Sequence, residues 1–264
     1  MPALSKFLRL AGGALALAAA SLATHAAPTT QLGFLVDASG SIGTTNFNIM
    51  KAGYVAALGA LPTDGSIEVT VVTFASSAAT VVAPTVVTAA SLPGILALIN
   101  SIVYSGGGTD TAAGINHITN LMTGPGNTNF SRNLNSMINI ATDGVPNSQT
   151  AAVAAASAAE TAGIDALTAE AIGSFDSSGL RSMVFSPLNG PCANCGTLLA
   201  AGSTPPNPMT SNPWVLPVNS FDDFAAAIHN KVQASTGQVP EPGMLALLAL
   251  GLVGLSVSRR NRFA

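Results

Sequence analysis

The stretch "GFLVDASGSIG", residues 33–43, decides how the rest of the chain is interpreted. An apolar run typical of a buried strand stops at a carboxylate, Asp37. Two hydroxyl side chains, Ser39 and Ser41, follow at alternate positions. Only 8% of the residues in this chain are charged, so an acidic group directly after a buried strand indicates a site rather than a solvated surface.

Strand-like and helix-like segments alternate along the chain outside this stretch. Strands are predicted over residues 31–36, 66–75, 79–82 (a short edge strand), 136–142 and 164–173, and helices over 47–61, 91–103, 111–122, 148–162 and from 220 onward. This order predicts an α/β fold with a mostly parallel sheet and helices on both faces. A proline-rich loop is expected over 186–217. Glu170, a lone acid, is expected to face an edge or a loop, and Ser220 and Asp223 have capping-box spacing.

Further oxygen-bearing side chains stand where this fold would place ligands. Asp143 follows the strand predicted over 136–142, and Thr109 lies in a glycine-rich loop before a helix. Ligands of such sheets bind at the carboxyl ends of the strands, so these residues are expected to meet Asp37, Ser39 and Ser41 at one edge. An all-oxygen set suits Mg²⁺, Ca²⁺ or Mn²⁺ rather than zinc or copper.

The three segments together resemble a known family. Asp37-Ala38-Ser39-Gly40-Ser41, then Gly107-Gly108-Thr109, then Thr142-Asp143-Gly144 resemble the metal-ion-dependent adhesion site (MIDAS) of the von Willebrand factor A (VWA) domain, with gaps of 72 and 34 residues between Asp37, Thr109 and Asp143. The resemblance implies a Rossmann-like, doubly wound sheet over 27–235 with Mg²⁺ at its edge. Ser39, Ser41 and Thr109 would bind the metal through hydroxyls, and Asp37 and Asp143 directly or through water. A partner's carboxylate would complete the coordination.

The first residues have the order of a secretory signal peptide. Lys6 and Arg9 precede an apolar stretch, residues 10–23, and a small-residue site follows, with cleavage expected after Ala26. We therefore predict a signal peptide over 1–26. An uncleaved membrane anchor is the alternative.

The last residues, 236–264, carry a second targeting pattern. Pro240-Glu241-Pro242 is followed by fifteen apolar residues, 243–257, and then by three arginines. This tail resembles the PEP-CTERM sorting signal of Gram-negative bacteria. The resemblance implies transient membrane insertion by a short transmembrane helix and removal of the tail by an exosortase. A permanent inner-membrane anchor is the alternative.

Charge and cysteine content restrict the partners. Residues 27–242 hold four basic and twelve acidic side chains, a net charge of −8 (4 minus 12), which disfavours nucleic acid. Cys192 and Cys195 lie in "GPCANCG", and a local disulfide is the first interpretation in an exported protein. A redox pair and a zinc site are weaker alternatives.

These patterns predict an exported binding module, not an enzyme. The chain lacks a G-x-S-x-G elbow around Ser39 or Ser41 and a phosphate-binding lysine beside the glycine-rich loop. We expect a MIDAS-type site that binds an acidic group on a surface protein or an exopolysaccharide, at the cell surface or in the extracellular matrix. The alternatives are a structural matrix or biofilm protein whose metal only stabilises the loops, and a metal-dependent hydrolase.

Overall fold

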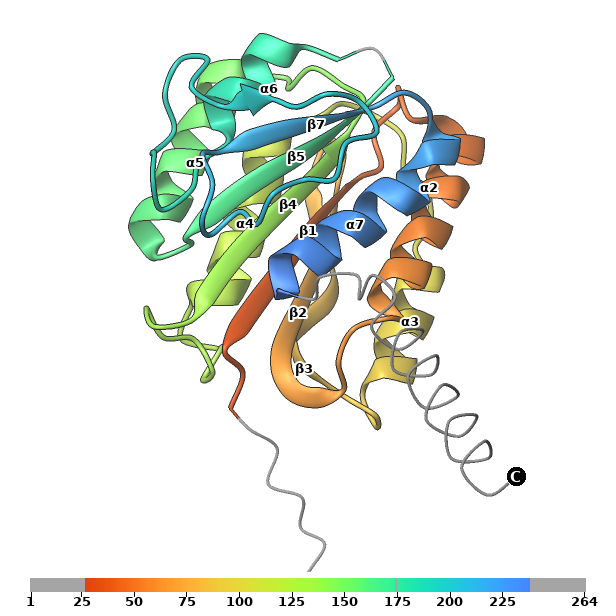
Figure 1. The fold of residues 1–264 in the computed structure, drawn as a ribbon. Coiled ribbons are helices and arrows are strands. Elements are labelled where there is room, and N and C mark those ends of the chain that lie inside the picture. The colour runs from red at the N-terminus through yellow and green to blue at the C-terminus, as the bar shows by residue number, and fades with distance from the viewer. Residues whose placement is uncertain (1–26, 174, 238–264) are drawn as a thin grey trace, which may run out of the picture.

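The computed structural model describes residues 27–173 and 175–237, and Figure 1 shows their arrangement as a three-layer α/β fold. The predicted signal peptide and sorting tail lie outside these residues. The strands are β1 (Thr30–Asp37), β2 (Asp64–Phe74), β3 (Ala78–Thr88), β4 (Asn135–Thr142), β5 (Ala166–Ile172), β6 (Thr197–Leu198) and β7 (Trp214–Val218). The helices are α2 (Gly43–Leu58), α3 (Leu92–Asn100), α4 (Thr111–Thr123), α5 (Gln149–Ala162), α6 (Ser177–Met183), the 3₁₀ turn η1 (Phe221–Asp223) and α7 (Phe224–Thr236).

The strands form one sheet in the order β3-β2-β1-β4-β5-β7-β6. Every neighbouring pair is parallel except β2 with β3, which is antiparallel. The predicted mostly parallel, doubly wound sheet is therefore confirmed. The chain moves outward from β1 to β2 on one side and to β4 on the other, so β1 and β4 flank the point where the strand order reverses.

Successive residues of the central strand supply two separate cores. Leu32, Phe34 and Val36 of β1 join a cluster beneath α2, α3 and α7. Leu35, pointing to the opposite face, joins a cluster beneath α4, α5 and α6. This alternation is the two-residue period of a strand buried on both faces. In Figure 1, α2, α3 and α7 accordingly cover the near face of the sheet, and α4 and α5 lie behind it.

Several predicted elements need correction. The expected edge strand over 79–82 is the eleven-residue β3, and the predicted loop over 186–217 contains β6 and the start of β7. Helix α6 was not predicted. Glu170 does not face an edge or a loop: it is fully buried in β5, between β4 and β7. At the last helix, the Ser220 hydroxyl donates to the Asp223 carboxylate at 2.9 Å and caps no backbone N–H.

Candidate metal centre

The carboxyl ends of β1 and β4 bring two of the predicted ligands to the same edge of the sheet. Val36 pairs with Ala141 in the parallel ladder, so Asp37 ends β1 beside the end of β4 and the loop that carries Asp143. The residues directly before this edge, Phe34-Leu35-Val36 in β1 and Ile140-Ala141 in β4, are apolar and buried. The position at the strand-order reversal is where open α/β sheets bind ligands.

Asp37 is fully buried and is held in one orientation by two hydrogen bonds. The backbone N–H of Ser39 donates to Oδ1 at 2.8 Å, and the hydroxyl of Thr142 donates to Oδ2 at 2.5 Å. Burial raises the pKa of Asp37, and nearby Asp143 raises it further, although these hydrogen bonds lower it in part. The hydrogen bonds therefore stabilise the negative charge of the ionised Asp37 carboxylate only in part, and a bound cation would supply the missing positive charge.

A chain of hydroxyl contacts joins the first loop to Asp143. The Ser39 and Ser41 hydroxyl oxygens lie 3.2 Å apart, and the Ser41 hydroxyl donates to Oδ1 of Asp143 at 2.7 Å. Burial raises the pKa of the partly buried Asp143, and the Ser41 hydrogen bond lowers it in part. Four of the five predicted ligands thus form one connected group.

Thr109 is positioned by the glycine-rich loop and by a residue that the sequence interpretation missed. Gly107 has φ 91°, a conformation that favours glycine, and its carbonyl accepts the N–H of Gly40 at 2.9 Å. The Thr109 N–H donates to Oδ1 of Asn147 at 2.9 Å, and the Thr109 carbonyl accepts the Asn147 N–H at 2.8 Å. These bonds join the loop before α4 to the loops after β1 and β4.

Gly144, which has no side chain, borders the space between these loops. A Cβ atom at this position would lie 3.3 Å from the Ser41 Oγ atom and 3.3 Å from the Thr109 Oγ1 atom. Both hydroxyls therefore border the same small space, and Thr109 joins the other four predicted ligands. The five side chains come from three loops far apart in the sequence.

The donors fit a hard divalent cation. Two carboxylates and three hydroxyls offer only oxygen, the ligand type of Mg²⁺, Ca²⁺ and Mn²⁺. Within the described ranges, no group of three or more His, Cys, Asp or Glu side chains could hold a metal ion.

Three supporting residues were not identified from the sequence. Thr142 orients Asp37, Asn147 holds Thr109, and the hydroxyl of Ser76 accepts the N–H of Gly108 at 2.9 Å. Thr142 stands next to Asp143, but nothing in the sequence reveals that its hydroxyl reaches a strand 105 residues away. Such supporting residues can be identified only from the folded structure, in which the loops lie side by side.

The cysteine loop docks on α6. Cys192 and Cys195 form a disulfide. Arg181 of α6 donates from Nε to the Gly196 carbonyl at 2.6 Å and from Nη2 to the Asn194 carbonyl at 2.8 Å. The disulfide loop is thus held by an arginine fork and belongs to the packing around α6.

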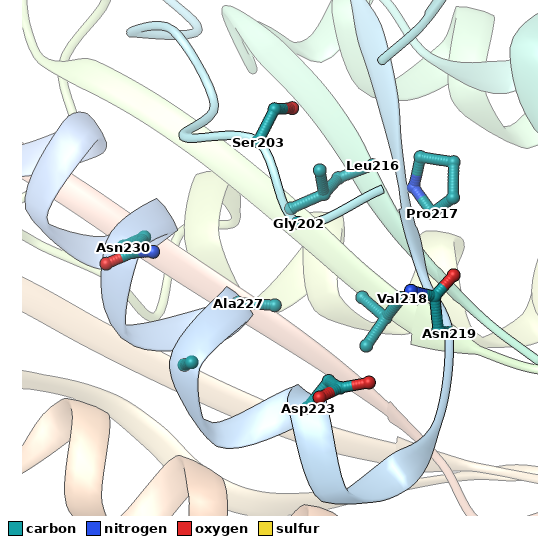
Figure 2. Close-up of a pocket in the computed structure, with 10 residues that line it drawn as sticks. Gly202, Ser203, Leu216, Pro217, Val218, Asn219, Asp223, Ala227 and Asn230 are labelled. Carbon is teal, nitrogen blue, oxygen red and sulfur yellow. The ribbon is translucent and has the colours of Figure 1, made fainter. Parts of the chain in front are cut away.

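A separate hollow of about 180 Å³ opens between β7 and α7. In Figure 2, Val218 and Ala227 face it from opposite sides, and Gly202 and Ser203 approach from the loop after β6. Among the described residues that line it, Asp223 is the one acidic side chain, and none is a predicted metal ligand. This pocket is therefore distinct from the candidate metal centre.

A doubly wound sheet with an aspartate–serine–serine, threonine and aspartate set at its switch point is the architecture of VWA domains. The family model for the von Willebrand factor type A domain matches residues 31–194, and the chain belongs to this family. A second model, the PEP-CTERM protein-sorting motif, matches residues 238–260. Both predicted resemblances are confirmed, and the motif indicates an exported protein that is anchored in a membrane before processing.

Solved structures share the fold at low sequence identity. Proximal thread matrix protein 1 (PTMP1) from the mussel byssus superimposes with a TM-score of 0.60 at 18% identity, covering 79% of this chain and 47% of that one. A von Willebrand factor type A protein from Catenulispora acidiphila gives 0.58 at 14%, covering 79% and 43%. The pilus adhesin SpaC from Lactobacillus rhamnosus GG gives 0.56 at 15%, covering 78% and 30%.

This chain spans about half the length of the first of these structures and less of the others. Another PTMP1 structure, with a TM-score of 0.58 at 18% identity over 78% of this chain and 48% of that one, has a zinc-occupied MIDAS motif. A search of curated proteins finds no match. Of the described residues, 27–173 and 175–237, no helix has the length and apolar character to cross a membrane; the apolar stretch predicted as an anchor lies outside them.

Proposed function

We propose that this chain is an exported, metal-dependent binding module whose MIDAS-type site grips an acidic group. The observation that carries the proposal is the convergence of Asp37, Ser39, Ser41, Thr109 and Asp143 around one small space at the edge of the sheet. The metal would link these side chains and supply an open coordination position to an outside carboxylate. The site holds no histidine or cysteine, and both of its carboxylates are assigned to the metal, which supports a binding role rather than an enzymatic one.

The exposure of the donors supports an outside ligand. Asp37 and Ser39 are fully buried at the floor of the site, whereas Ser41 is exposed and Asp143 is partly buried. A cation bound between floor and rim would therefore face solvent on one side. Mg²⁺ keeps open positions for water or ligand oxygen when the protein supplies few carboxylates. We assign Mg²⁺ as the ion, with Mn²⁺ and Ca²⁺ as alternatives.

Calorimetric titration of Mg²⁺ into the purified exported chain tests the site. The wild type should bind, and Asp37→Ala should not, because it removes a buried donor. Asp222→Ala is the matched control, since Asp222 is an exposed carboxylate on η1 and is not one of the five predicted ligands. Equal binding by the wild type and Asp37→Ala would contradict the assignment.

A binding assay on immobilised alginate, a uronic-acid polysaccharide, tests the proposed ligand class. Retention should require Mg²⁺, fail in EDTA and fail for Asp37→Ala, and neutral dextran should retain nothing. If alginate fails, a carboxylate-bearing surface protein becomes the proposed partner. Retention that is insensitive to EDTA would contradict a metal-bridged mechanism.

The second candidate is a structural matrix protein. Hydrogen bonds join the three loops around the site, and PTMP1, which shares the fold, is a thread matrix protein. In that case the metal would stabilise the loops and no partner would be lost when it is removed. Metal-dependent stability together with metal-independent retention in a reconstituted matrix would favour this candidate.

We also propose the processing of the two ends. Residues 1–26 would be removed as a signal peptide, 27–235 would form the VWA domain, and 236–264 would serve as linker and sorting signal for an exosortase. The product would leave the inner membrane for the cell surface or the matrix. Finding only full-length protein in the inner membrane of a host with an exosortase would contradict removal of the tail.

A further inference from the structure

A second group of polar side chains lies between the middle of the sheet and α7, and it includes none of the five predicted metal ligands. Lys231 of α7 is 2% exposed, Glu170 of β5 is 0% exposed, and Asn139 of β4 is 2% exposed. Lysine and glutamate are almost never fully buried unless they are paired. When two opposite charges are buried with incomplete hydrogen bonding, the free energy lost by removing them from water exceeds the gain from their attraction. This buried triad therefore requires a chemical explanation.

The three side chains converge on one face of the sheet. Asn139 stands directly opposite Thr168 in the pairing of β4 with β5, and Lys231 Nζ donates to Thr168 Oγ1 at 2.7 Å. Opposed residues on neighbouring strands have Cβ atoms about 5 Å apart, which places the lysine nitrogen within reach of the Asn139 carboxamide. Glu170, two residues beyond Thr168 on the same face, accepts a hydrogen bond from Asn139 Nδ2.

A narrow, water-excluding space connects the lysine to the asparagine. Both residues line one hollow without room for water, together with Leu32, Phe34 and Val232. Lys231 Nζ also lies 5.8 Å from the centroid of the Trp214 ring. An amine and a carboxamide that line one dry apolar hollow are placed for reaction rather than for solvation.

Two polar atoms of the triad have no hydrogen-bond partner. Asn139 Oδ1 and Glu170 Oε1 are buried, and neither has a hydrogen-bond partner. Burial raises the pKa of Glu170, and burial lowers the pKa of Lys231 to about 8, an effect that Glu170 partly offsets. Both shifts favour a neutral amine beside a protonated acid, the pair that an amide-exchange reaction needs.

We propose that Lys231 and Asn139 are joined by an intramolecular isopeptide bond, with Glu170 as the acid–base group that forms it. The Nζ atom attacks Cγ of Asn139, and a new Nζ–Cγ bond replaces the Cγ–Nδ2 bond. Glu170 takes the proton that Nζ loses and gives a proton to Nδ2, which leaves as ammonia. Glu170 returns to its starting state, and no oxidant or reductant is consumed.

The bond would fix α7 covalently to the central sheet. Helix α7 ends at Thr236, directly before the sorting motif matched over 238–260. A surface domain attached through its C-terminal end would experience force first on this helix. The link would hold α7 to β4 independently of the metal site.

Tryptic digestion of the purified full chain, followed by mass spectrometry, tests the proposal on the wild-type protein. Trypsin does not cut after a lysine whose Nζ is acylated. Asn139 lies in the tryptic segment 133–181 and Lys231 ends the segment 182–231. We expect an uncut Lys231, so that the second segment continues to the next arginine, Arg259, and a branched peptide that joins residues 133–181 to residues 182–259 and is lighter than their sum by one ammonia. The Cys192–Cys195 disulfide closes within the second segment and cannot produce this link.

Variants identify the chemistry. Asn139→Asp should give the same branched peptide with loss of water in place of ammonia, whereas Lys231→Arg and Glu170→Gln should give separate peptides. Lys51→Arg, which changes a lysine outside the triad, should leave the branched peptide unchanged. Separate, unmodified segments with cleavage after Lys231 in the folded wild type would overturn the proposal, whatever the variants do.

Discussion

Replacing Asp37 with asparagine should make the metal-free domain more stable while abolishing its response to Mg²⁺. The amide oxygen can accept the Ser39 N–H and the amide NH₂ can face the Thr142 hydroxyl, so contacts now at 2.8 and 2.5 Å are retained. In the wild type, burial and Asp143 raise the pKa of Asp37. When the pKa of a carboxyl is higher in the folded state than in the unfolded state, the fold loses stability as the pH rises through that higher pKa. At neutral pH, the charge of Asp37 therefore destabilises the metal-free domain. The neutral amide removes this cost.

Magnesium should reverse the order of stability. At a hundredfold excess over Kd, a bound ion stabilises the wild type by about 2.7 kcal/mol. One kcal/mol shifts the Tm of a domain of this size by roughly 2–4 °C, so the wild-type Tm should rise by roughly 5–11 °C. Scanning calorimetry in EDTA and in saturating Mg²⁺ measures both effects, with Asp222→Asn as a control that should follow the wild type. Equal Mg²⁺ shifts for the wild type and Asp37→Asn would refute this account of the site.

Two other substitutions separate the site from the rest of the fold. Gly144→Ala should weaken Mg²⁺ binding about tenfold with little change in the free energy of unfolding, because its Cβ would lie 3.3 Å from both Ser41 Oγ and Thr109 Oγ1. A calorimetric Mg²⁺ affinity within twofold of the wild type would contradict this geometry. Gly196→Ala should lower the free energy of unfolding by about 1–3 kcal/mol in urea and leave Mg²⁺ affinity unchanged, because its Cβ would lie 2.9 Å from the Arg181 carbonyl oxygen; unchanged stability would show that this loop yields freely.

The sheet was predictable where hydrophobic pattern and strand order agree. The segments that became β1, α4, β4 and α5 carry long apolar or alanine-rich patterns, and their predicted bounds differ from the observed ones by at most one residue at either end. Because parallel strands end at the same edge, the convergence of Asp37 and Asp143 also followed from sequence. Thr109 followed from its position between the glycine-rich loop and a helix.

Proline explains the strands that were missed or shortened. β3 contains Pro84 and lies at one edge of the sheet, where an absent N–H interrupts no second ladder. β7 contains Pro217 within a region rich in proline, and its five residues give too short a pattern to stand out. Helix α6 has only seven residues and includes Gly179, so its hydrophobic period is not visible in the sequence.

Glu170 illustrates a limit of a different kind. A single acid in a predicted strand is ordinarily placed toward solvent, because burial of an unpaired charge is costly. Its partners, Asn139 and Lys231, lie 31 and 61 residues away on a different strand and on the last helix. Only the tertiary structure shows that the acid is enclosed with an amide and an amine.

The loops of the metal site are joined by bonds that need no metal. The Gly106 N–H donates to the Ala38 carbonyl, the Gly40 N–H donates to the Gly107 carbonyl, and Asn147 is bonded to Thr109 in both directions. A metal required only to hold these loops together would therefore add little to contacts that already exist. These hydrogen bonds leave the negative charges of Asp37 and Asp143 unbalanced. A dication would neutralise them while keeping a coordination position toward solvent. This difference favours a ligand-binding role over a purely structural one.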